Sequence, residues 1–133
     1  MKKRGVFIVG LAVLAVALSM WWRHSTYHGG ASVVVDLPAL SATAQEGHAL
    51  FAANCAACHG TKGGGTDSGP PLVHIIYEPN HHGDESFQRA AAQGVREHHW
   101  NFGDMQRVDG VTRSDVVKIV DFVREVQRHN GIN

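Results

Sequence analysis

Two thiols and an imidazole stand close together in the run Cys55-Ala56-Ala57-Cys58-His59. A thiol can add to a vinyl group of haem and form a thioether, and an imidazole is a common ligand for haem iron. The spacing C-x-x-C-H is typical of covalent attachment of c-type haem. The chain has two cysteines, and both belong to this run. We therefore expect one covalent haem c, bound through Cys55 and Cys58, with His59 as an axial ligand of the iron.

Two other interpretations of the cysteine pair stay open from the residues alone. A C-x-x-C pair also occurs in thioredoxin-like redox sites, but those need a strand–helix context and the sequence has no βαβ pattern. A cysteine pair can also form half of a zinc site, but no second C-x-x-C half is present. We favour haem attachment over both alternatives.

A haem iron with one histidine ligand needs a second axial ligand if it is to be six-coordinate, and Met105 is the best-placed candidate. The other two methionines lie within the first 20 residues. No apolar stripe surrounds Met105, which weakens its interpretation as a core residue. A thioether raises the reduction potential of the iron compared with a second imidazole. The alternative is a centre with two imidazole ligands and a lower potential, for which the candidates are His74, His98 and His99.

The N-terminal segment has the pattern of a membrane anchor. Three basic residues precede an uncharged apolar run, residues 5–22. A helix of that length spans roughly 27 Å, close to the hydrocarbon thickness of a bilayer. Basic residues stay on the cytoplasmic side, and Trp21 and Trp22 suit the outer headgroup layer. We therefore expect residues 1–22 to form a single-pass signal-anchor helix in a bacterial cytoplasmic membrane, with the haem domain facing the periplasm.

A cleaved signal peptide is the alternative for this segment. Cleavage sites carry small residues just after the apolar run, and the bulky Trp21 and Trp22 stand there instead. Covalent haem attachment in bacteria takes place outside the cytoplasmic membrane, so both forms of export agree with the C-x-x-C-H run. We favour the uncleaved anchor.

The rest of the chain divides into a tether and one small domain. Residues 23–41 are expected as a periplasmic tether, in which residues 32–35 form a short strand or an extended segment. Residues 42–133 form the domain, whose core would be thin without a cofactor. Residues 60–83 are rich in Gly and Pro, and such a long loop is expected where the chain wraps around a flat apolar group. Helical patterns cover Ala44–Cys58, Asp84–Gln93 and a last segment between Thr112 and Gly131.

The last helix has the clearest pattern. Residues 112–115, with Thr112 first and Asp115 last, resemble an N-terminal cap with an acidic first turn. One face of this helix repeats an apolar residue at helical spacing, at Val116, Ile119, Val120, Val123 and Val126. In the helix before it, Asp84 is expected to cap the N-terminus and Gly94 to end the helix.

Together these features resemble a class I, mitochondrial-type monohaem c-type cytochrome over about residues 44–131. The features that carry the resemblance are the C-x-x-C-H run, the segment Gly69-Pro70-Pro71-Leu72, the Met105 loop and the flanking helices. The resemblance implies an all-α, small cytochrome c fold with helices wrapped around one covalent haem. It also implies that the Pro70 carbonyl receives a hydrogen bond from the imidazole of His59, and that Leu72 packs on the haem.

The same resemblance implies close packing between the first and last helices of the domain. A glycine and aromatic residues meet there in the family, and Gly47, Phe51 and Phe122 match that pattern. One residue departs from the family. The ligand methionine often precedes proline, but Gln106 follows Met105 here, and we expect a less rigid loop.

Three further features of the sequence bear on which functions are possible: Trp100, the number of histidines and the charge balance. Trp100 is expected to pack on the haem edge or in the core, rather than to be a surface contact for a partner. Ten histidines are many for 133 residues, and we expect those outside the haem motif to be solvated or at the haem edge, although imidazole also binds copper and zinc. Twelve basic residues balance twelve acidic ones, and the absence of a basic patch argues against nucleic-acid binding.

The sequence thus predicts a membrane-anchored single-electron carrier rather than an enzyme. With His59 and Met105 on the iron, no position is open for a substrate, and the partners are unidentified redox proteins. Two alternatives remain: a gas- or peroxide-reactive or sensor protein with a labile sixth ligand, and a His-rich accessory protein that handles metal ions.

Overall fold

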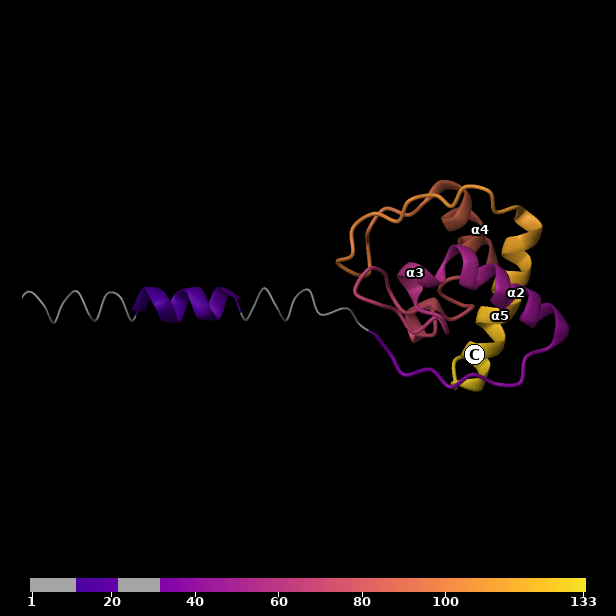
Figure 1. The fold of residues 1–133 in the computed structure, drawn as a ribbon, viewed down its shortest axis with the longest axis horizontal. Helices are drawn as coiled ribbons and strands as arrows, with labels where there is room; N and C mark the ends of the chain where they lie inside the picture. Colours follow the sequence, from indigo (N-terminus) through magenta and orange to yellow (C-terminus); the bar gives the residue numbers. More distant parts are fainter. Residues whose placement is uncertain (1–11, 22–31) are drawn as a thin grey trace, which may run out of the picture.

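The computed structural model describes residues 12–21 and 32–133. From residue 32 onward, the described chain is all-α, and its β contacts are two isolated bridges rather than strands. This confirms the predicted fold class for the domain (Figure 1). Its helical elements are α2 (Ala42–Asn54), α3 (Ala56–His59), the 3-10 helix η1 (Ile75–Tyr77), α4 (Asp84–Gln93) and α5 (Arg113–His129).

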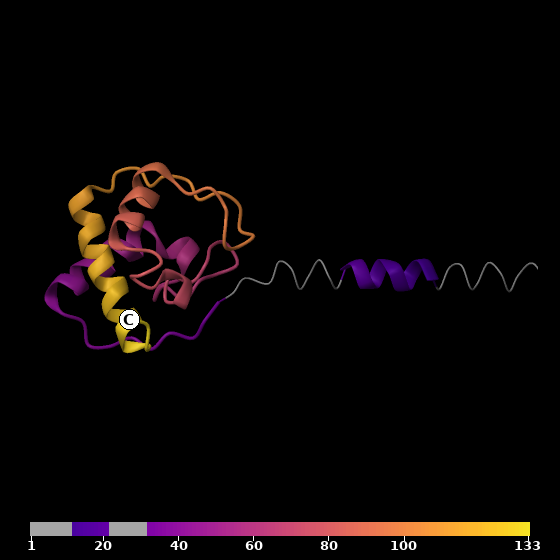
Figure 2. The same cartoon turned by 180° about the vertical axis from the view of Figure 1, so that it is seen from behind.

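The core forms where α2 crosses α5 (Figures 1 and 2). A Cβ atom at Gly47 would overlap with the backbone carbonyl of Lys118, so only glycine lets the two helices approach this closely. Phe51 and Phe122 are fully buried at the crossing, and their ring centroids lie 5.2 Å apart. Burial of such a side chain contributes about 1.5–3 kcal/mol. The predicted contact between a glycine and two aromatic residues is confirmed.

Helix α5 begins and packs as its sequence pattern predicts. The Thr112 hydroxyl accepts a hydrogen bond from the Asp115 N–H, and the Asp115 carboxylate accepts one from the Thr112 N–H, which completes the capping box. The predicted apolar stripe lies in the core, and all five of its valine and isoleucine residues are buried. The helix ends at His129, two residues before Gly131.

Two details of the predicted helices are wrong. The expected helix Ala44–Cys58 is broken at Cys55, whose backbone leaves helical geometry (φ −123°, ψ −31°), so α3 is a separate short helix. The N-terminus of α4 is capped by Gly83 rather than by Asp84. The carboxylate of Asp84 instead accepts a hydrogen bond from Arg124 Nε at 2.9 Å.

Residues 32–41, expected as part of the tether, pack on the domain (Figure 2). Val35 is buried in the core, and the Val33 N–H donates to the Gly64 carbonyl at 2.8 Å. The Asn130 side chain, just after α5, bonds both backbone groups of Asp36. The segment is extended without forming a strand, because one backbone contact with residue 64 is all that pairs it.

The expected membrane anchor is only partly described. Residues 12–21 are helical and exposed, while residues 1–11, Trp22 and tether residues 23–31 lie outside the described residues. None of the helices in the described ranges has both the length and the apolar character needed to cross a membrane. The anchor therefore stays a prediction.

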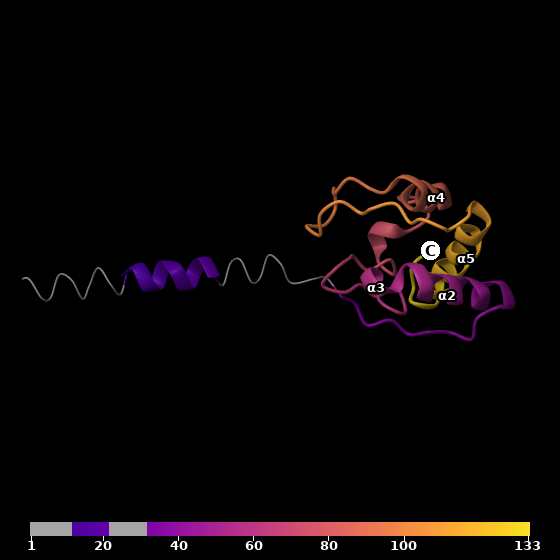
Figure 3. The same ribbon diagram turned by 45° about the horizontal axis from the view of Figure 1, so that its top comes forward.

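Viewed from the side, the domain has two layers that α5 connects. Helices α2 and α3 form one layer, and α4 with the following segment, residues 94–111, forms the other (Figure 3). Helix α5 packs against both α2 and α4. A cavity between the layers is lined by residues of α2, α3 and α4 and of residues 94–111.

Candidate functional site

The cavity has a volume of about 520 Å³, within the usual range of small-molecule and cofactor sites. Apolar side chains form much of its wall, among them Phe51 from α2 and Phe87 from α4. Six of the residues predicted to contact the haem also line the cavity. They are Cys55, His59, Pro70, Leu72, Trp100 and Met105. Cys58 does not line the cavity and is exposed.

A hydrogen bond from one ring nitrogen holds the imidazole of His59 in place. Its Nδ1 lies 2.8 Å from the carbonyl oxygen of Pro70, and since a carbonyl only accepts, Nδ1 carries the proton. The imidazole is buried, which lowers its pKa, while the hydrogen bond to Pro70 acts in the opposite direction. The ring is therefore neutral at pH 7, and the lone pair on Nε2 is available to a metal. The partner predicted for His59 is the partner observed.

The two cysteines stand at the junction of α2 and α3. Both are free thiols, with Cys55 partly buried and Cys58 exposed. Burial, and then the charge of Cys58, raise the pKa of Cys55 to about 11, so its thiol is protonated at neutral pH. The break in the helix at Cys55 places this thiol on the cavity wall, one helical turn before His59.

Met105 reaches the cavity through a backbone bridge. Its N–H and carbonyl each pair with Val95, with both N···O distances 2.9 Å. Gly94, directly before the bridge, has φ +77°, and a Cβ there would overlap with the Met105 carbonyl. Glycine is thus required where α4 ends against the Met105 segment. The predicted helix stop at Gly94 is confirmed.

The histidine alternatives for the iron differ in position. His98 and His99 line the cavity, whereas His74 does not. The Nδ1 atom of His74 accepts from the Ile76 N–H at 3.2 Å, and its ring meets Trp100 edge-on at 5.1 Å. His98 Nδ1 donates to the carbonyl of Arg96 at 2.8 Å.

Trp100 supplies a buried donor without an acceptor. Its Nε1 is the one buried side-chain nitrogen or oxygen in the described part of the chain that lacks a hydrogen-bond partner. The indole lowers the pKa of Tyr77, but burial raises that pKa by more, and the two groups do not reach hydrogen-bond geometry. An orphaned N–H costs free energy unless another group accepts from it. A flat apolar cofactor that carries carboxylates fits this cavity, with an imidazole, a thioether and a free N–H around it.

Two polar residues of α5 that the sequence analysis did not single out hold the cavity wall. Gln127 is 1% exposed, and its Nε2 donates to the carbonyls of Leu72 at 2.8 Å and Tyr77 at 3.0 Å. Arg124 donates from Nη1 to the Tyr77 carbonyl and from Nη2 to the His82 carbonyl. Their signal in the sequence is a pair of polar residues, three apart, within the apolar stripe of the last helix.

Comparison with known proteins agrees with this site. The family model for cytochrome c matches residues 44–127. A curated relative from Synechocystis sp., described as cytochrome c-553-like, is 41% identical over 80 residues, which cover 53% of this chain and 70% of the relative. No solved structure gives a significant match. The chain therefore belongs to the cytochrome c family, whose members are haem-based electron carriers, and it binds haem c covalently.

Proposed function

We propose that this protein is a single-electron carrier whose haem iron is ligated by His59 and Met105. The observation that carries the proposal is the shared cavity. The neutral imidazole of His59, whose Nδ1 is hydrogen-bonded, lines the same space as the thioether of Met105, which the backbone bridge to Val95 positions. The free thiol of Cys55 lies next to them. When bound, the haem supplies an iron that accepts and releases one electron.

The residues of the chain would set the properties of that iron. The hydrogen bond from His59 to the Pro70 carbonyl keeps Nε2 free and makes it a stronger donor to metal. The Met105 sulfur would favour the reduced iron and raise its potential. Trp100 Nε1, which has no partner, would be a donor available to a haem carboxylate. With His59 and Met105 both holding the iron, no position would be left for a substrate, and we propose no enzymatic activity.

Leu72 and the surrounding apolar residues would keep water from the iron. Leu72 is only 9% exposed, and its carbonyl is bonded by Gln127, so α5 fixes its position in the cavity wall. A dry surrounding favours the form of the iron centre with the lower charge, which adds to the effect of the thioether.

We further propose that the protein works on the periplasmic face of a bacterial cytoplasmic membrane. The apolar run of residues 5–22, the basic residues before it and the C-x-x-C-H run support this placement. An anchor would raise the effective concentration of the carrier near membrane-bound redox partners. Fractionation of cells that express the intact chain tests this: haem-stained protein should need detergent for release, and release by buffer alone contradicts the anchor.

The electron-carrier proposal is tested on purified holo-protein. A potentiometric titration should follow a one-electron curve, and the reduced protein should not bind carbon monoxide at neutral pH, because Met105 holds the sixth position. Ready binding of carbon monoxide would contradict six-coordination and favour a gas-reactive protein. Absence of haem-dependent peroxidase staining on a denaturing gel would contradict covalent attachment at Cys55 and Cys58.

A further inference from the structure

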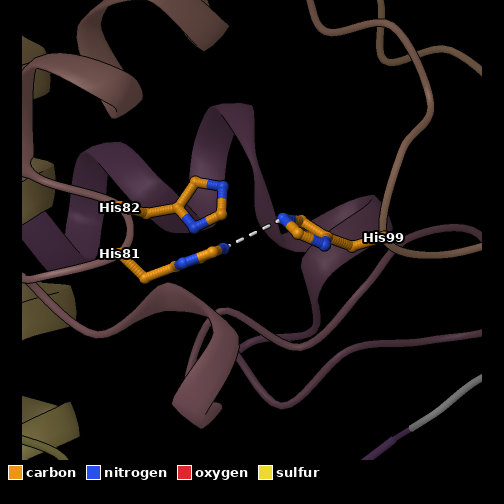
Figure 4. Close-up of side chains that lie close together, drawn as sticks. All are labelled: His81, His82 and His99. Carbon is orange, nitrogen blue, oxygen red and sulfur yellow. Dashed lines mark hydrogen bonds between the residues drawn. The ribbon is translucent and has the colours of Figure 1, made fainter.

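Three imidazoles from two distant parts of the chain meet at the edge of the cavity. His81 and His82 lie in the turn before α4, and His99 lies in the segment between α4 and α5 (Figure 4). One nitrogen from each ring falls within 4.8 Å of the nitrogens from the other two. His81 and His99 are exposed, and His82 is partly exposed, so the three rings are accessible from solvent.

The distance between two of these rings matches the requirements of a metal ion. The Nε2 atoms of His81 and His99 are 3.3 Å apart and share a hydrogen bond, which a bound ion would replace (Figure 4). Zinc–nitrogen bonds of 2.0–2.1 Å in tetrahedral geometry place two ligand nitrogens about 3.3 Å from each other. We propose that His81, His82 and His99 form a second metal site, distinct from the haem, for a single divalent ion such as Zn²⁺ or Cu²⁺.

The ring of His82 is already oriented for this role. Its Nδ1 lies 2.7 Å from the carbonyl oxygen of Ile76, so Nδ1 carries the proton and Nε2 keeps its lone pair. A bond of this kind, from the second ring nitrogen to a carbonyl, is the usual support of a metal-binding histidine. Arg124 Nη2 donates to the carbonyl of His82 and fixes the backbone of the same residue.

The chemistry of the cluster selects the class of ion. The three donors are all imidazole nitrogens, which suit zinc, copper and nickel, whereas calcium and magnesium require oxygen ligands. Desolvation and the neighbouring imidazoles lower the pKa of His82 and of His99; at His82 the hydrogen bond to Ile76 acts in the opposite direction, and the charge of Arg124 lowers the pKa further. The two rings are therefore neutral at pH 7, as metal binding needs.

A bound ion would join two segments that carry cavity residues. His82 and His99 both line the cavity. His99 lies in the same segment as Met105, residues 94–111. The ion would thus link the turn before α4 to the loop of the proposed sixth ligand. That loop lacks the stiffening proline after Met105, since Gln106 stands there. The site goes beyond electron transfer and does not depend on which residue is the sixth iron ligand, unless that residue is one of its own histidines.

The test is calorimetric titration with ZnCl₂ at pH 7.5 of the haem-loaded protein from which all other metal has been removed. We expect one Zn²⁺ per chain, and affinity weaker by at least about tenfold in each of the variants His81→Asn and His99→Asn, since even loss of a supporting residue costs 10–100-fold. His129→Asn is the matched control, because His129 is an exposed histidine that pairs with Asp36 away from the cluster. Its affinity should equal that of the unchanged protein.

Three results would overturn the proposal: no binding of Zn²⁺, equal affinity in the two cluster variants and the control, or a changed haem absorption spectrum in His99→Asn. The last result would make His99 an iron ligand and would also remove Met105 from the iron, whereas the first two leave the electron-carrier proposal intact. Hydrogen exchange provides an independent readout. Zn²⁺ should slow exchange of the amides in residues 96–104 of the unchanged protein and leave those of His81→Asn unaffected, and equal slowing in both would place the ion elsewhere.

Discussion

Arg124 Nη2 donates a hydrogen bond to the carbonyl oxygen of His82 at 2.5 Å. The side chain of Arg124 is 7% exposed, although it carries a full charge. Its other donors reach the Tyr77 carbonyl, the Gln127 side chain and the Asp84 carboxylate, and its guanidinium lies 5.0 Å from the centre of the Phe87 ring. One residue of the last helix thus holds the turn that carries His82 and the start of α4.

Replacement of Arg124 by methionine should lower the free energy of unfolding by about 3 kcal/mol, because the His82 carbonyl and the buried Gln127 Oε1 lose their donor, while the Tyr77 carbonyl keeps only its bond from Gln127. The exposed carboxylate of Asp84 loses its partner at little cost. Guanidinium denaturation of the holo-protein measures the change. Arg113→Met is the control, since Arg113 pairs with Glu85 at the surface, where such pairs contribute at most about 1 kcal/mol. Equal losses in the two variants would contradict the structural role of Arg124.

Gly94→Ala should displace Met105. The added Cβ overlaps with the Met105 carbonyl, and the alanine backbone must also adopt φ near +77°. Gly110→Ala is a matched control, because Gly110 has φ +80° but open space around its Cα. Both variants should lose about 1 kcal/mol of stability from the backbone conformation. Carbon monoxide should bind the reduced form of Gly94→Ala alone, and binding by neither variant would mean that the Met105 segment is not displaced.

Met105→Ala should leave the haem attached but remove the thioether from the iron. The near-infrared ligand-to-iron band of the ferric protein should disappear. The reduction potential should decrease, by an amount inside the roughly 0.8 V range that axial ligands control. Absorption spectra and a potentiometric titration measure the two effects. Gln106→Ala, one residue further on, should change neither. A Met105→Ala protein that keeps both the band and the potential would show that another residue is the ligand.

Asp115 should make the stability of the domain depend on pH in acid. The Thr112 hydroxyl and N–H lower the pKa of Asp115 below its usual value of 3.8. A carboxylate with a lowered pKa stabilises the folded state fully above the unfolded-state value, and this contribution is lost as the pH falls through the folded-state pKa. Asp115→Asn should therefore be less stable than the unchanged protein at pH 6, with the difference shrinking toward pH 2. Denaturant midpoints of Asp115→Asn and of the unchanged protein, measured from pH 6 to pH 2, check this pattern, and a difference that stays constant over the range would contradict it.

The features that local spacing determines were predicted correctly from the sequence. The predicted cap needs only Thr112 and the acidic Asp115 three residues later, and the structure joins them in a capping box. The C-x-x-C-H run likewise brings Cys55 next to the cavity that His59 lines. Such features depend on the geometry of one helical turn, so they do not require knowledge of the rest of the fold.

The errors and omissions come from contacts between distant residues. Asp84 has the residue type of a helix cap, but Arg124, forty residues later, engages its carboxylate. Val35 was assigned to a tether because nothing in its own segment shows that it is buried in the core. His99 comes to lie beside His81 only through the path of the chain around α4. Pairwise spacing along the chain carries no signal of these encounters.

The two backbone hydrogen bonds between Val95 and Met105 leave the side chain at position 105 out of the interactions that place it. Under the proposed function, the route of the main chain thus determines where the sixth donor atom stands, and the residue type determines only which donor atom that is. Related proteins could exchange sulfur for nitrogen at this point by a single codon change and so adjust their electrochemical driving force without refolding the loop.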